Sequence, residues 1–286
     1  MSCRKHFLEG GHMKKQICII AFLAVIIFSC GFYFGYRFIK YEKNQSQQAQ
    51  ETQASMSELS EETRILSEDD IEWENDEYNY LAIGNSITLH GIESIWWNEI
   101  GMAASDEEHD YYHIVLKYLK ENNEFVKGVP YNFCEWETTS RDRNETLEYL
   151  DHYLGPELDL VTIQLGENAQ LGENEKNLKK YQEDYASLIN YVKEKAPNAR
   201  ILVVDDFWSD GYRNERKKNA AEETGVEFVS LEGITNNKEY YCGLNTIVYD
   251  KDGGEHIVEH SGVANHPGDK GMAAIASRII EVLKGE

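Results

Sequence analysis

The chain has 286 residues, of which 28 are basic and 51 acidic, so its formal net charge at pH 7 is −23. A protein that binds nucleic acid needs a basic face to neutralise phosphates, and this acidic excess argues against a nucleic-acid partner. The hydrophobic share of 41% is enough for a packed core and excludes a wholly disordered chain.

The first predicted element is an uncharged apolar run at residues 16–36. At 1.5 Å per residue, a helix of this length spans the roughly 30 Å hydrocarbon core of a bilayer. We expect a transmembrane signal-anchor at 16–36, with residues 1–15 as a short cytoplasmic segment. A cleaved signal peptide is the alternative, but its apolar region is usually only about 7–15 residues long. Ser29-Cys30-Gly31 is a poor lipoprotein cleavage site, because apolar residues continue past the cysteine.

Residues 37–77 are expected to form an acidic, polar stalk. Eleven acids and a single base, Arg64, lie between residues 44 and 77, and such a composition buries too little apolar area to fold. The remainder, 78–286, has the size of one domain. Because everything after the apolar run is strongly acidic, we expect this domain on the outer side of the cell membrane.

The domain alternates between apolar strands and amphipathic helices. Strands are predicted at 79–84, 125–133, 158–165, 199–205 and 226–231. The clearest helix has apolar residues at helical spacing between Leu178 and Val192, and the last helix has them between Met272 and Leu283, with Asp269 as its N-cap. Continuously apolar strands between helices predict an α/β fold with a mainly parallel sheet covered on both faces.

Two of four candidate positions directly follow predicted strands, where ligands of such sheets bind. Ser86, in Gly84-Asn85-Ser86, follows the first strand, and Asn168 follows the third. Gly101 lies between the first two strands, and His266 precedes the last helix. Taken alone, Ser86 is more simply a turn or cap residue. Together the four residues supply a nucleophile, a base and donors to an oxyanion.

At these positions the chain resembles the SGNH, or GDSL-like, hydrolase superfamily, whose four sequence blocks carry Ser, Gly, Asn and His in this order. The resemblance implies a three-layer α/β/α, flavodoxin-like fold. It also implies Ser86 as nucleophile, His266 as base, and an oxyanion hole made by Ser86, Gly101 and Asn168. Asn85 replaces the usual Asp before the serine, and Gly-Glu-Asn-Ala replaces the usual Gly-x-Asn-Asp of the third block.

One departure concerns the group that orients the base. The family commonly has Asp three residues before the histidine, and this chain has Val263 there. Either a backbone carbonyl orients His266, or another acid does so; Glu255, Glu259 and Asp269 are near in sequence. The implied mechanism is ester hydrolysis through an acyl-serine, which needs no metal or organic cofactor.

Other features have plain structural interpretations beside functional ones. His109/His113 and His256/His260 have the spacing of a metal pair on a helix, but surface histidines are favoured. Asp205-Asp206 is read as a solvated strand end rather than a metal pair, and Gly253-Gly254 as a turn. Trp96 and Trp97, and less strongly Trp208, could line a sugar cleft or simply pack. Cys134 and Cys242 could form a disulfide.

The sequence therefore predicts a membrane-anchored, extracytoplasmic serine esterase, with an O-acyl or O-acetyl group on a carbohydrate or cell-wall glycan as substrate. A lipase, thioesterase or acyltransferase using the same serine is the alternative among enzymes. A catalytically weak module that binds glycan is the alternative outside them. The sequence identifies no protein partner.

Overall fold

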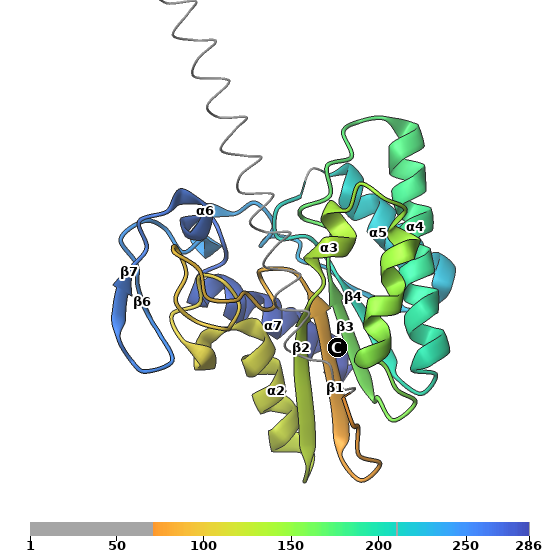
Figure 1. Ribbon diagram of the computed structural model, residues 1–286, viewed down its shortest axis with the longest axis horizontal. Coiled ribbons are helices and arrows are strands. Elements are labelled where there is room, and N and C mark those ends of the chain that lie inside the picture. The colour runs from red at the N-terminus through yellow and green to blue at the C-terminus, as the bar shows by residue number, and fades with distance from the viewer. Residues whose placement is uncertain (1–70, 210, 286) are drawn as a thin grey trace, which may run out of the picture. The chain divides into compact units, whose positions relative to one another are not determined.

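Figure 1 shows a computed structural model, which describes residues 71–209 and 211–285. The expected cytoplasmic segment 1–15, the expected anchor 16–36 and the expected stalk up to residue 70 lie outside the described residues. Within the described ranges, no helix has the length and apolar character needed to cross a membrane.

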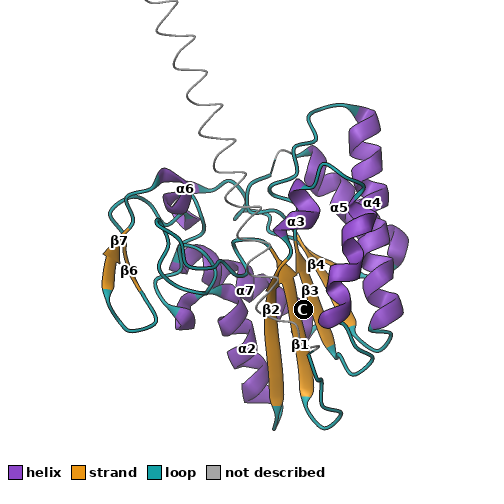
Figure 2. Cartoon of the chain, viewed as in Figure 1, coloured by secondary structure: helices purple, strands orange, loops and turns teal. Residues whose placement is uncertain are grey.

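The domain is built on a five-stranded sheet in which every pairing is parallel. Its strands lie in the order β2-β1-β3-β4-β5, the flavodoxin-like order, in which ligands bind beyond the carboxyl ends of β1 and β3. A short antiparallel hairpin, β6–β7, stands apart from this sheet (Figure 2). The strands are β1 Tyr78–Gly84, β2 Val126–Asn132, β3 Leu160–Gln164, β4 Arg200–Val204, β5 Glu227–Val229, β6 Ile247–Tyr249 and β7 Glu255–Ile257.

Helices cover both faces of the sheet, so the expected three-layer α/β/α architecture is confirmed. α2 and α7 lie on one face and α4 and α5 on the other (Figure 1). The α-helices are α2 Tyr111–Asn122, α3 Cys134–Thr138, α4 Glu175–Lys195, α5 Tyr212–Thr224, α6 Ser261–Ala264 and α7 Asp269–Lys284. The 3-10 helices are η1 Glu107–His109, η2 Arg143–His152 and η3 Lys238–Tyr240.

The central strands are apolar throughout because both of their faces are buried. On β1, Tyr80 and Ala82 belong to the core under α2 and α7, whereas Leu81 and Ile83 belong to the core under α4 and α5. The same alternation recurs on β4. Side chains of successive strand residues point to opposite faces, so a continuous apolar run fills two cores at once. This is why these strands could be predicted from sequence.

The folded domain begins earlier than the expected boundary at Tyr78. Trp73 is buried in the core beside α4, and its indole Nε1 donates to the Tyr153 carbonyl at 2.9 Å. Ile71 N donates to the His152 carbonyl at 2.8 Å. Residues 71–77 are therefore part of the domain rather than of a solvated stalk. An indole buries a large apolar area, which outweighs the acidic composition around it.

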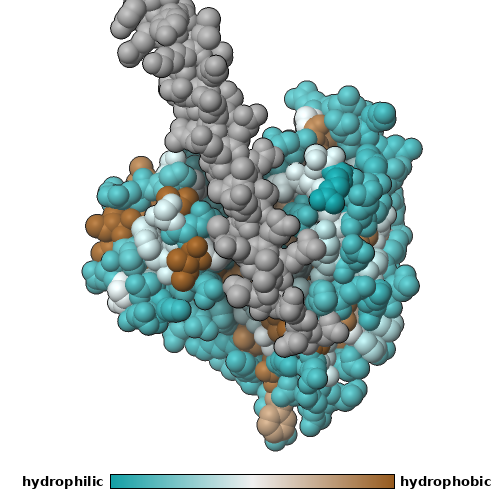
Figure 3. Space-filling view, in the orientation of Figure 1, coloured by the Kyte–Doolittle hydropathy of each residue, from teal (hydrophilic) through white to brown (hydrophobic). Residues whose placement is uncertain are grey.

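The β6–β7 hairpin carries exposed apolar side chains. Ile247 and Ile257 are register partners across the hairpin, and both are about half exposed, as is Leu244 just before it. Figure 3 shows hydrophobic residues gathered near this hairpin on an otherwise largely hydrophilic face. The expected turn at Gly253-Gly254 connects the two strands, and Gly253 has a positive φ of 81° that suits glycine.

Candidate active site

A tight turn after β1 presents the predicted nucleophile, Ser86. Gly84 is required at the strand end, because a Cβ there would collide with the Thr88 side chain. The Asn85 side-chain oxygen accepts from Ile87 N at 3.0 Å, and its carbonyl accepts from Thr88 N at 2.9 Å. The backbone of the turn is thus fixed from both sides, while Ser86 itself stays partly exposed.

The turn brings Ser86 to the predicted base. Ser86 Oγ lies 2.8 Å from His266 Nε2, although 180 residues separate them in sequence. His266 follows the short helix α6, and its Nδ1 lies 2.8 Å from the Gly262 carbonyl. A carbonyl can only accept, so Nδ1 carries the ring proton and Nε2 is free to accept from the serine hydroxyl. This is the tautomer that a general base needs.

The group that orients His266 is therefore a backbone carbonyl, one of the two alternatives left open by the sequence. Val263, at the position where the resembled family has Asp, is buried in the core under α7. Asp269 is the first residue of α7 rather than its N-cap, and its carboxylate accepts from Ser105 N at 2.7 Å. Asp269 is thus engaged away from the imidazole.

The environment of His266 keeps its imidazole neutral. The pKa of His266 is lowered to about 4, chiefly by burial and to a smaller extent by His90 nearby, while the hydrogen bond to Gly262 acts in the opposite direction. Burial disfavours the charged form because it removes the hydration of the imidazolium. At neutral pH the ring is consequently ready to accept a proton.

The two other predicted oxyanion residues lie close to the turn but are already hydrogen-bonded. Met102 N donates to the Ser86 carbonyl at 2.8 Å, and a Cβ on Gly101 would collide with the Ile87 carbonyl. Gly101 N, however, donates to Asp110 at 3.2 Å. Asn168 is partly exposed, and its Nδ2 lies 2.5 Å from a carboxylate oxygen of Glu137. Donation from Gly101 N–H to an oxyanion stays a prediction, since it requires Asp110 to share this N–H.

Two buried carboxyl groups beneath the turn were not predicted as site residues. Asn85 Nδ2 donates to both Glu137 and Glu167, at 3.0 Å each. Glu167 also accepts from Phe207 N at 2.8 Å. Burial raises the pKa of both carboxyl groups. Asparagine stands where the resembled family usually has Asp, and a third carboxylate at that point would repel these two instead of donating to them.

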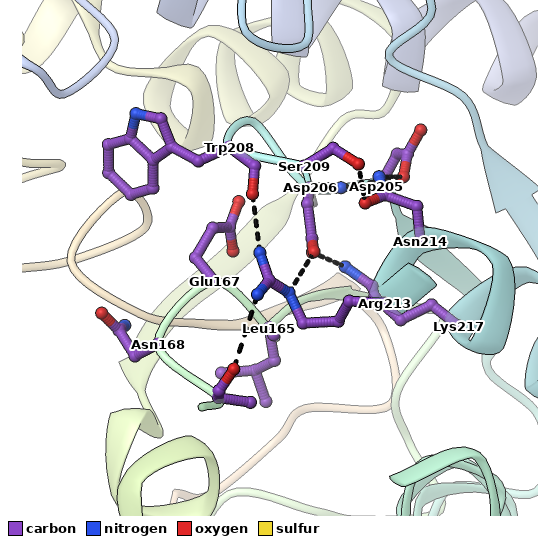
Figure 4. A network of polar contacts seen from close by, with 12 residues as sticks. Leu165, Glu167, Asn168, Asp205, Asp206, Trp208, Ser209, Arg213, Asn214 and Lys217 are labelled. Carbon is purple, nitrogen blue, oxygen red and sulfur yellow. Dashed lines mark hydrogen bonds and ion pairs between the residues drawn. The ribbon is translucent and has the colours of Figure 1, made fainter. Parts of the chain in front are cut away.

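The loop after β4 places an aromatic ring beside the base. The Trp208 indole meets the His266 ring edge to face, with centroids 4.8 Å apart, and its Nε1 donates to the Asn265 carbonyl at 3.0 Å. Figure 4 shows how Arg213 reaches from α5 to hold this loop: it donates to the Trp208 carbonyl and to the Asp206 carboxylate, both at 2.6 Å. Asp206 is fully buried, so its interpretation as a solvated strand end was wrong.

Several secondary predictions are settled by position. Trp96 is fully buried in the core and cannot line a cleft, and Trp97 stacks on His256 with ring centroids 4.5 Å apart.

His256 lies on β7 rather than on a helix and pairs with Asp250 at 2.8 Å. His109 and His113 likewise contact acidic residues of their own segment. Among the residues that the structure describes, no group of three ligating side chains could hold a metal. Cys134 and Cys242 are free thiols.

Comparisons with known proteins give structural likenesses only. No protein-family model and no curated protein matches this sequence. The chain is similar to the structure of a GDSL-like lipase from Bacteroides ovatus, with 14% identity, 73% of this chain and 100% of that chain covered, and a TM-score of 0.47. A family two carbohydrate esterase from Clostridium thermocellum in complex with cellohexaose has 16% identity, coverage of 73% and 64%, and a TM-score of 0.46. A phospholipase A1 from Streptomyces albidoflavus has 12% identity, coverage of 72% and 99%, and a TM-score of 0.43.

Proposed function

We propose that this protein is a serine hydrolase that cleaves an ester, with Ser86 as nucleophile and His266 as general base. The observation that carries the proposal is the 2.8 Å contact between Ser86 Oγ and His266 Nε2, in a ring whose other nitrogen is engaged by the Gly262 carbonyl. A serine hydroxyl is a weak nucleophile until a base within hydrogen-bond reach accepts its proton. Here the base is within reach and in the required tautomer.

The reaction would proceed in two displacements. Ser86 Oγ attacks the acyl carbon while its proton passes to His266 Nε2, and the alcohol leaves with that proton. A water molecule then attacks the acyl-serine, His266 accepts a proton from the water, and the acid departs as Ser86 regains its hydrogen. Both steps need only a base that accepts and returns one proton.

The oxyanion formed in each displacement needs donors aimed at it. We assign this role to the N–H of Ser86 and to the side-chain amide of Asn168, with Gly101 N–H as the third predicted donor. Among the described residues, no acceptor takes the Ser86 N–H. The amide of Asn168 has two N–H bonds, and its Nδ2 contacts Glu137 at 2.5 Å and Cys134 Sγ at 3.5 Å. A thiol sulfur is a weak acceptor, which an oxyanion would replace.

For the substrate we propose an O-acyl or O-acetyl group on a neutral carbohydrate or cell-wall glycan. Trp208 supports this choice, because its indole is partly exposed and lies beside His266, and sugar rings pack well on flat aromatic faces. The acidic balance of the whole chain, −23, disfavours polyanionic substrates. We further propose that residues 16–36 anchor the protein in the cell membrane with the domain outside.

The test is esterase activity with a serine control. We expect the purified full-length chain in detergent to hydrolyse p-nitrophenyl acetate, and Ser86→Ala to lower kcat at least about 10³-fold, as the loss of a triad serine does. Equal turnover by both proteins would refute the proposal. Release of acetate from acetylated xylan or acetylated peptidoglycan, compared with hydrolysis of long-chain esters, then separates a glycan esterase from a lipase.

A further inference from the structure

A buried carboxylate, that of Glu137, connects three separate segments of the site. Glu137 lies on α3, between β2 and η2, and its side chain is only 1% exposed. One of its oxygens accepts from Asn85 Nδ2 at 3.0 Å and from Gly166 N. The other accepts from Asn168 Nδ2 at 2.5 Å. The carboxylate therefore contacts the turn before the nucleophile and the segment after β3.

We propose that Glu137 is a positioning residue that fixes the orientation of the Asn168 amide, so that this amide presents an N–H to the oxyanion. The inference rests on the proposed function, because it concerns the same oxyanion hole. Glu137 itself touches neither the substrate nor the reacting atoms.

The chemistry of the two groups supports this assignment. An asparagine amide has a donor end and an acceptor end of similar shape, and only its partners decide which end points where. Burial raises the pKa of Glu137, but the N–H donors of Gly166, Asn168 and Asn85 act against it and favour the ionised form. An ionised carboxylate only accepts, so it holds the Nδ2 end of Asn168 and turns the carbonyl end away. An amide in the opposite orientation would place oxygen where an oxyanion needs a donor.

The carboxylate is itself held firmly enough to act as a reference point. Asn85 and Gly166 engage one oxygen, and the backbone of α3 is fixed by Arg143, which donates to the Trp136 carbonyl at 3.0 Å and to the Glu137 carbonyl at 3.3 Å. Trp136 is fully buried. Preorganised donors stabilise a transition state most when they need not move during the reaction. The hydrogen bonds from Asn85, Gly166 and Arg143 keep Glu137 in place in this way.

The test is a double-mutant cycle on p-nitrophenyl acetate in the full-length protein. We expect Asn168→Ala to lower kcat by about 10²–10³, the usual cost of one oxyanion donor. We expect Glu137→Gln to lower kcat at least about 10-fold with little change in KM, because a glutamine NH₂ facing Asn168 would reverse its amide. The double variant should be no slower than Asn168→Ala alone, since Glu137 acts only through Asn168.

The control variant is Tyr80→Phe, which removes another buried hydrogen bond, that between Tyr80 and Thr162 at 3.0 Å. It should lower the melting temperature without changing kcat. If Glu137→Gln does not fold, as judged by circular dichroism, Glu137→Asp replaces it in the cycle. Its side chain is one methylene shorter and withdraws the carboxylate from Asn168 Nδ2, so a loss of kcat is again expected.

Two results would overturn the role of Glu137. In the first, the losses of the two single variants multiply in the double variant. In the second, the kcat of the Glu137 variant lies within about twofold of the parent, which is near the usual error of such cycles. Turnover that survives Ser86→Ala refutes the proposed function instead, so the two failures are distinguishable.

Discussion

The base of this site is oriented without a carboxylate. His266 Nδ1 meets the Gly262 carbonyl, and Val263 fills the position of the usual acid with an apolar, buried side chain. Among the described residues no carboxylate contacts the ring, so none would compensate the imidazolium that the proposed attack by Ser86 forms. Burial is consequently the largest influence on the pKa of His266, which is lowered to about 4.

This lowered pKa predicts activity at unusually low pH. His266 must be neutral to act as a base, and its neutral form persists until the pH falls through about 4 rather than through the ordinary value of about 6.5. We expect the acid limb of kcat/KM against pH, which reports the free enzyme, to have its midpoint nearer 4 than 6.5. Circular dichroism at each pH controls for unfolding, and a midpoint at about 6.5 in folded protein would contradict the assignment.

The sequence predicted Ser86 and His266, which the structure brings into contact, but not the groups that surround them. Ser86 and His266 stand in short motifs, and those motifs could be matched. Glu137 stands in Cys-Glu-Trp-Glu-Thr, where nothing distinguishes it from a surface glutamate. Its proposed role rests on contacts with Asn85 and Asn168, 52 and 31 residues away, and only the fold creates them.

Among the elements, the loop after β4 and the helix α5 form one unit. Asp206, at the end of the strand, contacts the buried side chains of Lys217 and Arg213 from α5, each at 2.6 Å. Burial alone would lower the pKa of Lys217, but the Asp206 carboxylate raises it above its ordinary value. The contact with Asp206 therefore favours the charged form of Lys217 inside the core.

Removing Asp206 should destabilise the domain strongly. Asp206→Ala would leave Lys217 charged and without the carboxylate that it contacts, and breaking a buried ion pair in this way costs about 3–5 kcal/mol. Urea unfolding measures the change. As a control, Glu222→Ala removes an exposed carboxylate 3.9 Å from Lys218 and should cost at most about 1 kcal/mol. A similar cost for the two variants would show that the buried network is not needed for stability.

The predicted elements were those with a strong periodic or apolar pattern. All five strands of the main sheet and the helices α4 and α7 were found in this way. The hairpin β6–β7 was missed because its strands have three residues each and expose Ile247 and Ile257, so they show no inside–outside alternation. The helix α5 was not among the predicted elements, because Arg213 and Lys217 made its sequence look polar although both side chains are buried.

At the scale of the whole molecule, strand order explains why distant residues meet. β1 lies between β2 and β3 in the sheet, and the carboxyl ends of parallel strands share one edge. Ser86 follows β1 and Asn168 follows β3, so the two segments become neighbours through adjacent strands. The sequence predicted the parallel sheet, but the position of His266 depends on the path of the chain between β5 and α7, for which no pattern exists.

The proposed location can be tested on intact cells. If residues 16–36 anchor the protein with the domain outside, a protease that cannot enter cells should remove the domain and its Ser86-dependent activity. A cytoplasmic enzyme in the same cells should survive the treatment and shows that they stayed closed. Protection of the domain together with that enzyme would contradict the outward orientation.

The Gly262 carbonyl has a consequence for how this site can be altered. Ser86 and His266 are specified by their codons, and a single base change can remove either. The group that contacts His266 Nδ1 is a carbonyl of the main chain, so every amino acid at position 262 would supply it. No substitution deletes this acceptor; one can only displace it by bending α6. The arrangement is thus protected from the point mutations that would disable a carboxylate in the same role.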